Sequence, residues 1–306
     1  MMLADLPAAV IHQCLATADG LRIKTGPLTF AIQTRLETVA QGIRRLYAQY
    51  ELASPGDFVD YYVKLKTPAS LRRWYKPQVL FDFDGRIPFK PLPLAQAFPM
   101  LEWGMNWCIA NHCHQWLILH AAVIAKNNRA VIMPAPPGSG KSTLCAGLVG
   151  NGWRLLSDEL AIIDMETGHV VPMPRPVGLK NDSIEIIRKF LPDAVIGPIC
   201  HDTRKGTVAH MAASQADSMN REQAIPTWVI FPQYRPDSEA VLTPHPKANA
   251  MVHLANNAFN NHITGLKGFK RLTQIVDATD IFNFHYARLQ DAVSVFERLA
   301  AANPIK

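Results

Sequence analysis

The segment from Ala135 to Thr143 constrains the fold of this chain more than any other feature. It reads Ala-Pro-Pro-Gly-Ser-Gly-Lys-Ser-Thr, and it stands between an apolar run at residues 130–133 and a helical pattern at residues 144–149. A glycine-rich turn that ends in Gly-Lys-Ser between a strand and a helix is the pattern of a phosphate-binding loop. The pattern therefore predicts an α/β fold with an anion site where the helix begins.

The residue types in this loop have separate predicted roles. Gly138 and Gly140 allow backbone conformations in which successive N–H groups point at one anion, and the helix adds its positive end. Lys141 reaches the β- and γ-phosphates, and the Ser142 hydroxyl ligates Mg²⁺. Ala135 stands where the pattern has its first glycine, which is tolerable if Ala135 keeps a negative φ. The predicted nucleotide-binding residues are Pro137, Gly138, Ser139, Gly140, Lys141, Ser142 and Thr143.

Two acidic residues follow the loop closely. A strand is predicted over residues 153–157, and Asp158 and Glu159 stand at its end. One carboxylate in such a place holds the metal that bridges the phosphates, and a second orients or deprotonates an attacking hydroxyl. The alternative is an exposed acidic turn with no part in chemistry.

The order of these motifs resembles the catalytic core of the bacterial HPr kinase/phosphorylase family. The resemblance rests on Leu119–Val123, on the loop, and on residues 154–159, which provide a strand histidine, a phosphate loop and an acidic pair in that order. A narrower similarity, to the HPr-kinase-related kinase A group, extends over most of the chain. The resemblance implies a phosphate-loop kinase core of the HPr kinase and phosphoenolpyruvate carboxykinase type, with a smaller N-terminal α/β unit.

The resemblance also implies roles for single residues. By position, Asp158 is the metal-associated carboxylate and Glu159 is the base that accepts the proton of the acceptor hydroxyl. The family has aspartate at the second place, and the extra methylene of Glu159 changes its reach by about 1.5 Å, so Asp158 is the alternative base. His120 is placed beside the phosphates. Without the resemblance it is a hydrogen-bonded core histidine on an apolar strand.

Phosphoryl transfer needs at least one cation besides Lys141, because in the transition state negative charge spreads over the equatorial oxygens of the transferred phosphoryl group. Two loop-like segments, residues 172–180 and 201–207, are rich in basic groups. We expect Arg175 and Lys205 to supply this charge, and Arg175 is the nearest analogue of an arginine-containing loop in the related kinases. The alternative for each is a solvated loop base.

A proline-rich joint divides the chain. Four prolines between Ile87 and Pro99 suit neither a helix nor a central strand, which predicts an N-terminal unit over residues 1–95 and a kinase-like domain over residues 96–306. In the first part we expect strands at residues 21–24, 29–33, 58–65 and 79–83 and a helix at 36–50. In the second we expect strands at 117–124 and 281–286 and helices at 101–115, from 266 onward and at 289–300.

Three further patterns each have two interpretations. Residues 71–76 interleave bases with aromatics, which indicates either a docking surface or a solvated basic edge with Trp74 packed beneath it. Cys108 and His112 are four apart, as in a zinc site, but they also fit the buried side of a core helix. The amide-rich residues 256–262 contact a nucleotide or acceptor, or else cap a helix.

Composition narrows the class of protein. The chain has 306 residues, of which 48% are hydrophobic, and a net charge of +6, which favours anionic ligands without singling out nucleic acid. It has no apolar run near the roughly 18–20 residues that cross a bilayer, and its first residues do not resemble a signal peptide. Five cysteines without repeated spacing suit a reducing compartment. We expect a cytoplasmic protein without membrane or nucleic-acid partners.

These patterns lead to one expected function and two alternatives. The expected function is a Mg²⁺-dependent kinase that transfers the γ-phosphate of ATP to a hydroxyl, most simply serine, of a protein or peptide. The resemblance implies that the acceptor can be a modified peptide with its chaperone, and that the protein is a homo-oligomer. The alternatives are a small-molecule hydroxyl kinase and a non-catalytic regulatory module that senses ATP. No motif distinguishes ATP from GTP or pyrophosphate as donor.

Overall fold

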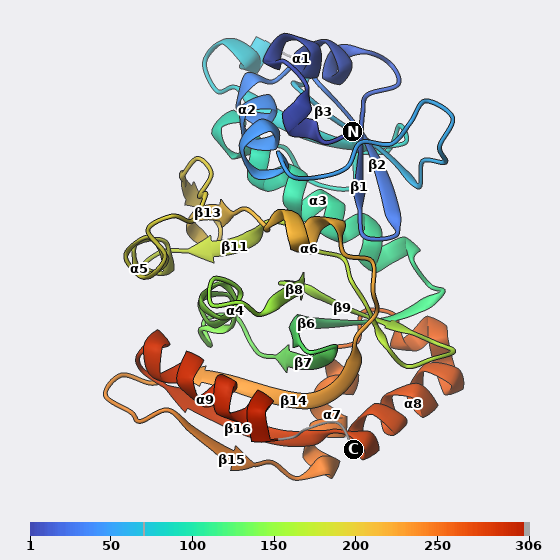
Figure 1. Ribbon diagram of the computed structural model, residues 1–306. Coiled ribbons are helices and arrows are strands. Elements are labelled where there is room, and N and C mark those ends of the chain that lie inside the picture. Colours follow the sequence, from blue (N-terminus) through green and yellow to red (C-terminus); the bar gives the residue numbers. More distant parts are fainter. Residues whose placement is uncertain (70, 303–306) are drawn as a thin grey trace. The chain divides into compact units, whose positions relative to one another are not determined.

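The computed structural model describes residues 1–69 and 71–302, and the chain forms two compact units (Figure 1). Each unit is assembled from three stretches of chain. The first contains Met1–Ile109, Gly178–Ile184 and Val195–Asn220, and the second contains Ala110–Val177, Glu185–Ala194 and Arg221–Lys306. The mixed α/β class is confirmed, whereas a domain boundary between residues 95 and 96 stays a prediction.

The first unit contains a five-stranded sheet in the order β1-β2-β3-β4-β5. Its strands are β1 (Leu21–Thr25), β2 (Leu28–Thr34), β3 (Tyr61–Lys66), β4 (Gln78–Phe83) and β5 (Leu92–Pro93). The helices and 3-10 turns before α3 are η1 (Leu3–Asp5), α1 (Ala8–Ala16), α2 (Glu37–Leu46), η2 (Leu71–Trp74) and η3 (Leu94–Gln96). The predicted strands are present, except that the strand expected at residues 58–65 begins only at Tyr61.

The helix expected at residues 36–50 ends early, at Leu46. Tyr47 and Tyr50 follow it with fully buried rings whose centroids lie 4.6 Å apart, and the Tyr47 hydroxyl donates to Glu102 at 2.6 Å. Burial of both rings requires the backbone to leave the helix, so tertiary packing decides where α2 ends.

A three-stranded sheet, in the order β11-β13-β12, is formed by β11 (Val177–Lys180), β13 (Gly206–Met211) and β12 (Cys200–Thr203). Three helices come before, between or after these strands along the chain: α3 (Ala97–His112), α5 (Ser183–Phe190) and α6 (Gln215–Met219). Helix α3 begins inside the proline-rich joint, four residues before the predicted start at residue 101. Pro99 lies in its first turn, where a missing N–H removes no helical hydrogen bond.

The second unit is built on a larger sheet, in the order β10-β9-β6-β7-β14-β16-β15, with β8 also paired to β6. Strands β7, β14 and β16 are parallel, and the other pairs are antiparallel. The strands are β6 (Trp116–Lys126), β7 (Arg129–Pro134), β8 (Arg154–Ser157), β9 (Leu160–Asp164), β10 (Val170–Val171), β14 (Ile225–Tyr234), β15 (Val241–Pro244) and β16 (Asp280–Tyr286). The helices are α4 (Lys141–Val149), α7 (Lys247–Asn256), α8 (Asn261–Ala278) and α9 (Leu289–Ala302).

Helices cover this sheet on both sides (Figure 1). Alternate residues of β6, such as Leu117 and Leu119, belong to one buried apolar cluster with Leu254 of α7 and Leu272 of α8. Because side chains alternate along a strand, His120 projects from the opposite face. Phe296 of α9 packs edge-on against Trp153 and Phe284.

Helix α8 contains an interruption near its start. Its backbone is interrupted at Gly265, with φ 55° and ψ −136°, so the regular helix begins where the sequence predicts it, after that glycine. Among residues 1–69 and 71–302, no helix combines the length and apolar character that a bilayer span requires.

Candidate phosphate-binding site

The predicted phosphate loop connects β7 to α4, in the strand and helix context that the pattern requires. Gly138 and Gly140 both have φ +86°, in the left-handed region that favours glycine. A Cβ on Gly140 would lie 2.5 Å from the Tyr286 hydroxyl, whereas the space beside Gly138 is open. Ala135 is buried and does not have a positive φ, so alanine is accommodated where the pattern has glycine.

Lys141 is the first residue of α4, and its side chain is buried with 8% of its surface exposed. Its Nζ atom has no hydrogen-bond partner among the described residues. An ammonium withdrawn from water without a partner is strongly disfavoured, so this position favours the binding of an anion. Ser142 and Thr143, both half-buried, complete the first turn of the helix.

Two tyrosines hold the loop from neighbouring strands. The Tyr234 N–H donates to the Ser139 carbonyl oxygen at 2.8 Å, and the Tyr286 hydroxyl donates to the Gly140 carbonyl oxygen at 2.9 Å. These tyrosines are the last residues of β14 and β16, which run parallel to the strand that leads into the loop. Sequence reasoning missed both, because the only signal was their place at a strand end and β14 was not predicted.

The acidic pair lies one strand away from the start of the loop. Strands β8 and β9 pair with the same edge of β6, with Ser157 opposite Val123 and Leu160 opposite His120. Asp158 and Glu159 form the irregular connection between these strands. On the other edge of β6, Ala121 lies opposite Pro134, the residue that precedes the loop. Two strand spacings, about 10 Å in all, therefore separate the backbone of the pair from the beginning of the loop.

The structure brings together the histidine and the second carboxylate of the predicted site. His120 Nε2 lies 3.7 Å from Glu159 Oε2, and both side chains are about one-third exposed, at 33% and 28%. Asp158, by contrast, is buried with 4% of its surface exposed. The two acids thus differ in accessibility: Glu159 can meet an incoming group, and Asp158 faces the interior.

The amide-rich segment holds the backbone of β6 between Trp116 and His120. Asn260 is fully buried: its Oδ1 accepts the Ile118 N–H at 3.0 Å, and its Nδ2 donates to the Trp116 carbonyl at 2.7 Å. The His120 N–H donates to the Asn257 carbonyl at 2.8 Å. The Phe259 ring stacks on the imidazole of His120, with centroids 5.6 Å apart and planes at 28°. The segment therefore pairs with β6, which neither interpretation of the sequence included. Its predicted contact with a nucleotide or acceptor stays a prediction.

The two predicted loop cations have different surroundings. Arg175 is buried with 8% exposure between β10 and β11. Lys205 belongs to the first unit, in the exposed turn between β12 and β13, where its ammonium lies 5.1 Å from the centre of the Trp103 ring. A contact of either cation with phosphate stays a prediction.

A further cation, which sequence reasoning missed, follows the loop-binding Tyr234. The Arg235 N–H donates to the Tyr286 carbonyl at 3.0 Å, and its guanidinium donates to Gln233 Oε1 at 2.9 Å. Burial, with a further contribution from the positive charge of Arg235, lowers the pKa of His285 on β16. Arg235 therefore places positive charge at the strand ends that hold the loop.

The candidate metal ligands are few. The described residues contain no group of three or more His, Cys, Asp and Glu side chains arranged to hold a metal. Mg²⁺ with a nucleotide needs only one or two protein ligands, because phosphates and water complete its coordination, and Ser142 with Asp158 is a set of that size. For the zinc alternative, Cys108 is buried in α3 but His112 is exposed, so the prediction that both face the core is wrong for His112.

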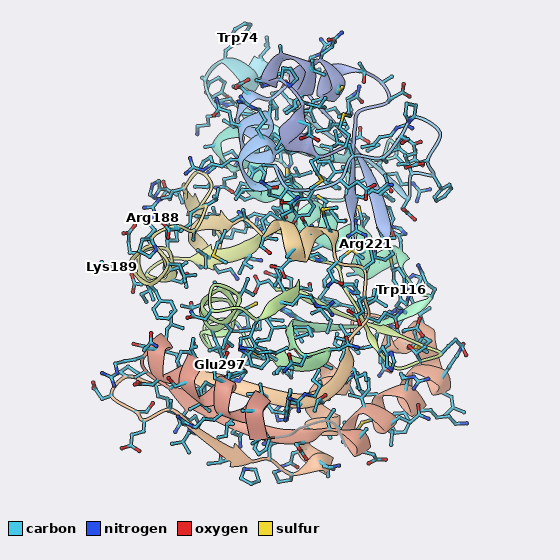
Figure 2. The ribbon with its side chains drawn as sticks, in the orientation of Figure 1. Trp74, Trp116, Arg188, Lys189, Arg221 and Glu297 are labelled. Carbon is cyan, nitrogen blue, oxygen red and sulfur yellow. The ribbon has the colours of Figure 1, made fainter. Side chains whose placement is uncertain are left out.

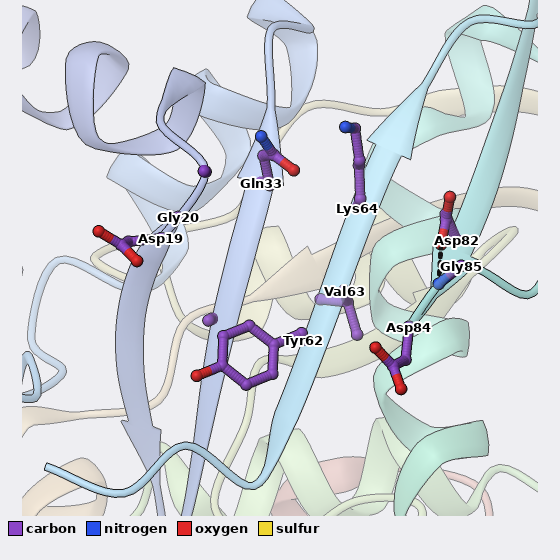
Figure 3. A pocket seen from close by; sticks show the side chains of 11 residues that line it. Asp19, Gly20, Gln33, Tyr62, Val63, Lys64, Asp82, Asp84 and Gly85 are labelled. Carbon is purple, nitrogen blue, oxygen red and sulfur yellow. Dashed lines mark hydrogen bonds between the residues drawn. The ribbon is translucent and has the colours of Figure 1, made fainter.

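The first unit has two further surface features, an exposed tryptophan and a hollow, and neither includes a predicted catalytic or nucleotide-binding residue. Trp74, marked in Figure 2, is 76% exposed, so the prediction of a tryptophan packed beneath the basic edge is wrong. A hollow of about 280 Å³ lies beside β2, β3 and β4. Figure 3 shows the side chains that line it, several of which are polar. They include Asp82, which accepts the Gly85 N–H at 2.8 Å and pairs with Lys66.

Comparisons with known proteins identify a similar solved structure but no family. No family model and no curated protein matches the chain. Among solved structures, the HPr(Ser) kinase/phosphatase from Coxiella burnetii is similar, at 11% identity over 61% of this chain and 99% of that chain, with a TM-score of 0.29. A TM-score of this size supports no conclusion about activity.

Proposed function

We propose that this chain is a Mg²⁺-dependent kinase that transfers the γ-phosphate of ATP to a serine hydroxyl of a protein or peptide. The observation that carries the proposal is the buried Lys141 ammonium without a partner, at the start of α4, after two glycines in the left-handed region. A cation in that position favours a polyphosphate ligand, and the glycine backbone lets N–H groups approach the same anion.

The loop residues Pro137 to Thr143 bind the phosphates in this proposal, with Lys141 paired to the β- and γ-phosphate oxygens. Ser142 and Asp158 would hold Mg²⁺, which when bound neutralises charge on the phosphates. The burial of Asp158 suits a metal ligand, because a bound cation offsets part of the cost of holding a carboxylate away from water. The predicted cation Arg175, together with Arg235, is proposed to neutralise the charge that develops on the transferred group, and a part for Lys205 of the first unit stays a prediction.

Glu159 is proposed as the base. Its greater exposure than that of Asp158 leaves it accessible to an acceptor hydroxyl, whose proton it accepts as the hydroxyl oxygen bonds to the γ-phosphorus. The bond between that phosphorus and the bridging oxygen breaks, and ADP leaves with the electron pair. His120, 3.7 Å from Glu159, orients the carboxylate and balances its charge when protonated.

Substitution of the loop lysine tests the binding step. We expect Lys141→Ala to weaken MgATP affinity at least about a hundredfold, because the phosphates lose a desolvated charged partner. Isothermal titration calorimetry measures the affinity, and transfer of labelled γ-phosphate to peptides measures turnover. Lys270→Ala, which removes an exposed lysine of α8, is the matched control and should change neither. A Lys141→Ala protein that bound ATP and transferred label at the normal rate would exclude the proposal.

Glu159→Gln separates the proposed kinase from its alternatives. In a kinase it should bind MgATP normally and lose on the order of 10²–10⁴-fold in transfer, the usual contribution of a general base. Label recovered on low-molecular-weight compounds instead of peptides would identify a small-molecule kinase. Nucleotide binding by the unaltered protein without any transfer would identify a regulatory module. Parallel reactions with GTP and pyrophosphate determine the donor.

A further inference from the structure

We infer that Tyr286 is a positioning residue for the phosphate loop. Its hydroxyl sets the direction of the Lys141 N–H, the first N–H group of α4. The inference rests on the proposed function, since it assigns the tyrosine a role in binding polyphosphate. Tyr286 comes from the last position of β16, 146 residues along the chain from its hydrogen-bond partner Gly140.

The Gly140 carbonyl accepts two hydrogen bonds, one from the Leu144 N–H along α4 and one from the Tyr286 hydroxyl, both at 2.9 Å. The described chain contains no cis peptide bond, so the Gly140 carbonyl and the Lys141 N–H point in opposite directions across one planar group. The Tyr286 hydroxyl, by fixing the direction of the Gly140 carbonyl, therefore also fixes the direction of the Lys141 N–H.

The Lys141 N–H is one of the helix-terminal donors that have no acceptor within α4. It points toward the Ser139 hydroxyl oxygen at 3.4 Å, a long contact that a phosphate oxygen can replace. Glycine can readily rotate such a peptide plane, and a rotated plane would present the Gly140 carbonyl dipole to the anion. The Tyr286 hydroxyl opposes that rotation.

The surroundings of Tyr286 suit a fixed donor. Its ring is 2% exposed, stacks on Phe284 with centroids 5.4 Å apart, and meets Tyr234 edge-on at 6.0 Å. Burial, with a smaller contribution from Tyr234, raises the pKa of Tyr286, so the hydroxyl keeps its proton at neutral and moderately alkaline pH. The ring contacts do not involve the hydroxyl, and Gly140 keeps the Leu144 bond without it.

Tyr286→Phe tests the inference in the full-length protein. We expect affinity for MgATP and for magnesium tripolyphosphate to fall by the same factor, about tenfold, which is the order of one positioned hydrogen bond. Equal losses on both probes are expected because the tyrosine acts on the phosphate loop and not on a base. The KM for ATP should rise by that factor, with kcat at saturating ATP nearly unchanged. Tyr62→Phe, which removes an exposed hydroxyl from β3, is the control and should change neither.

Each outcome has a distinct meaning. Unchanged affinity in Tyr286→Phe would overturn the inference and leave the proposed kinase intact. Circular dichroism of the same samples measures the fraction of folded protein. A loss of MgATP affinity no larger than the loss of folded protein would also overturn the inference, because the role of Tyr286 would then be structural only. If the unaltered protein bound neither probe, the proposed function itself would fail.

Discussion

Gly138 and Gly140 have the same φ, yet their surroundings make them unequal. An alanine at either position adopts a left-handed conformation that costs about 1–3 kcal/mol. At Gly138 that is the whole cost, because nothing lies within 4 Å of the added Cβ. At Gly140 the Cβ also meets the hydroxyl of Tyr286, whose ring is held by Phe284 and cannot readily move.

We therefore expect Gly138→Ala to reduce the free energy of unfolding by about 1–3 kcal/mol, and Gly140→Ala to reduce it by about 1–3 kcal/mol more than that. Urea unfolding monitored by tryptophan fluorescence measures both. Equal losses in the two variants would contradict the role assigned to Tyr286 as a rigid neighbour of the loop.

At the scale of elements, strand β6 is the part of the fold on which the candidate site depends. One of its edges carries the β7 strand that leads into the loop, and the other carries the connection that contains the acidic pair. Where β7 does not reach, the segment from Asn257 to Asn260 completes the pairing. The buried amide of Asn260 satisfies an N–H and a carbonyl of β6 that would otherwise have no acceptor or donor there.

We expect Asn260→Ala to reduce the free energy of unfolding by about 2–4 kcal/mol, since two buried backbone groups lose their partners. Asn256→Ala, four residues earlier at the exposed end of α7, is the matched control and should cost less than about 0.5 kcal/mol. Chemical denaturation of both variants checks this. Similar stabilities would show that β6 does not depend on the amide.

Strand β14 shows how sequence reasoning failed at this scale. It contains Pro226 and Pro232, and a proline argues against a central strand because it cannot donate to the ladder. The strand is nevertheless central, between β7 and β16, and its pairing with β7 shifts register between Pro226 and Trp228. The fold thus accommodates a proline at an irregularity that no local pattern reveals.

For the whole molecule, the important feature is that the first unit is not continuous in sequence. Its core joins residues before the proline-rich joint to residues after it. Tyr47 donates to Glu102 at 2.6 Å, and the Ser218 hydroxyl donates to the Gln49 carbonyl at 2.5 Å. A Cβ on Gly197 would lie 2.7 Å from Leu46. The later stretches of this unit therefore depend on residues 1–95 for burial.

We expect a fragment of residues 96–306 to lack a cooperative unfolding transition, because it retains parts of the first unit without the strands and helices that bury them. Urea unfolding and binding of a hydrophobic dye compare the fragment with the full chain. A single steep transition in the fragment, with unchanged ATP affinity, would show instead that the predicted kinase-like domain folds alone.

The sequence alone determined the loop and its immediate context. Residues 138–142, the strand before them and the helix after them are close along the chain, and local conformational preference with burial of an apolar strand is enough to form them. The acidic pair and His120 were also identifiable, since they belong to strands that follow or precede the loop directly.

Only the tertiary structure decided what holds these groups in place. Tyr234, Tyr286 and Asn260 contact the loop or β6 from positions about a hundred or more residues away, through a pairing order of strands that no local pattern specifies. Tertiary packing likewise separated the acids, with Asp158 buried and Glu159 accessible. The physical reason is that residue type and spacing act over a few residues, whereas burial and the direction of a hydrogen bond depend on which distant elements meet.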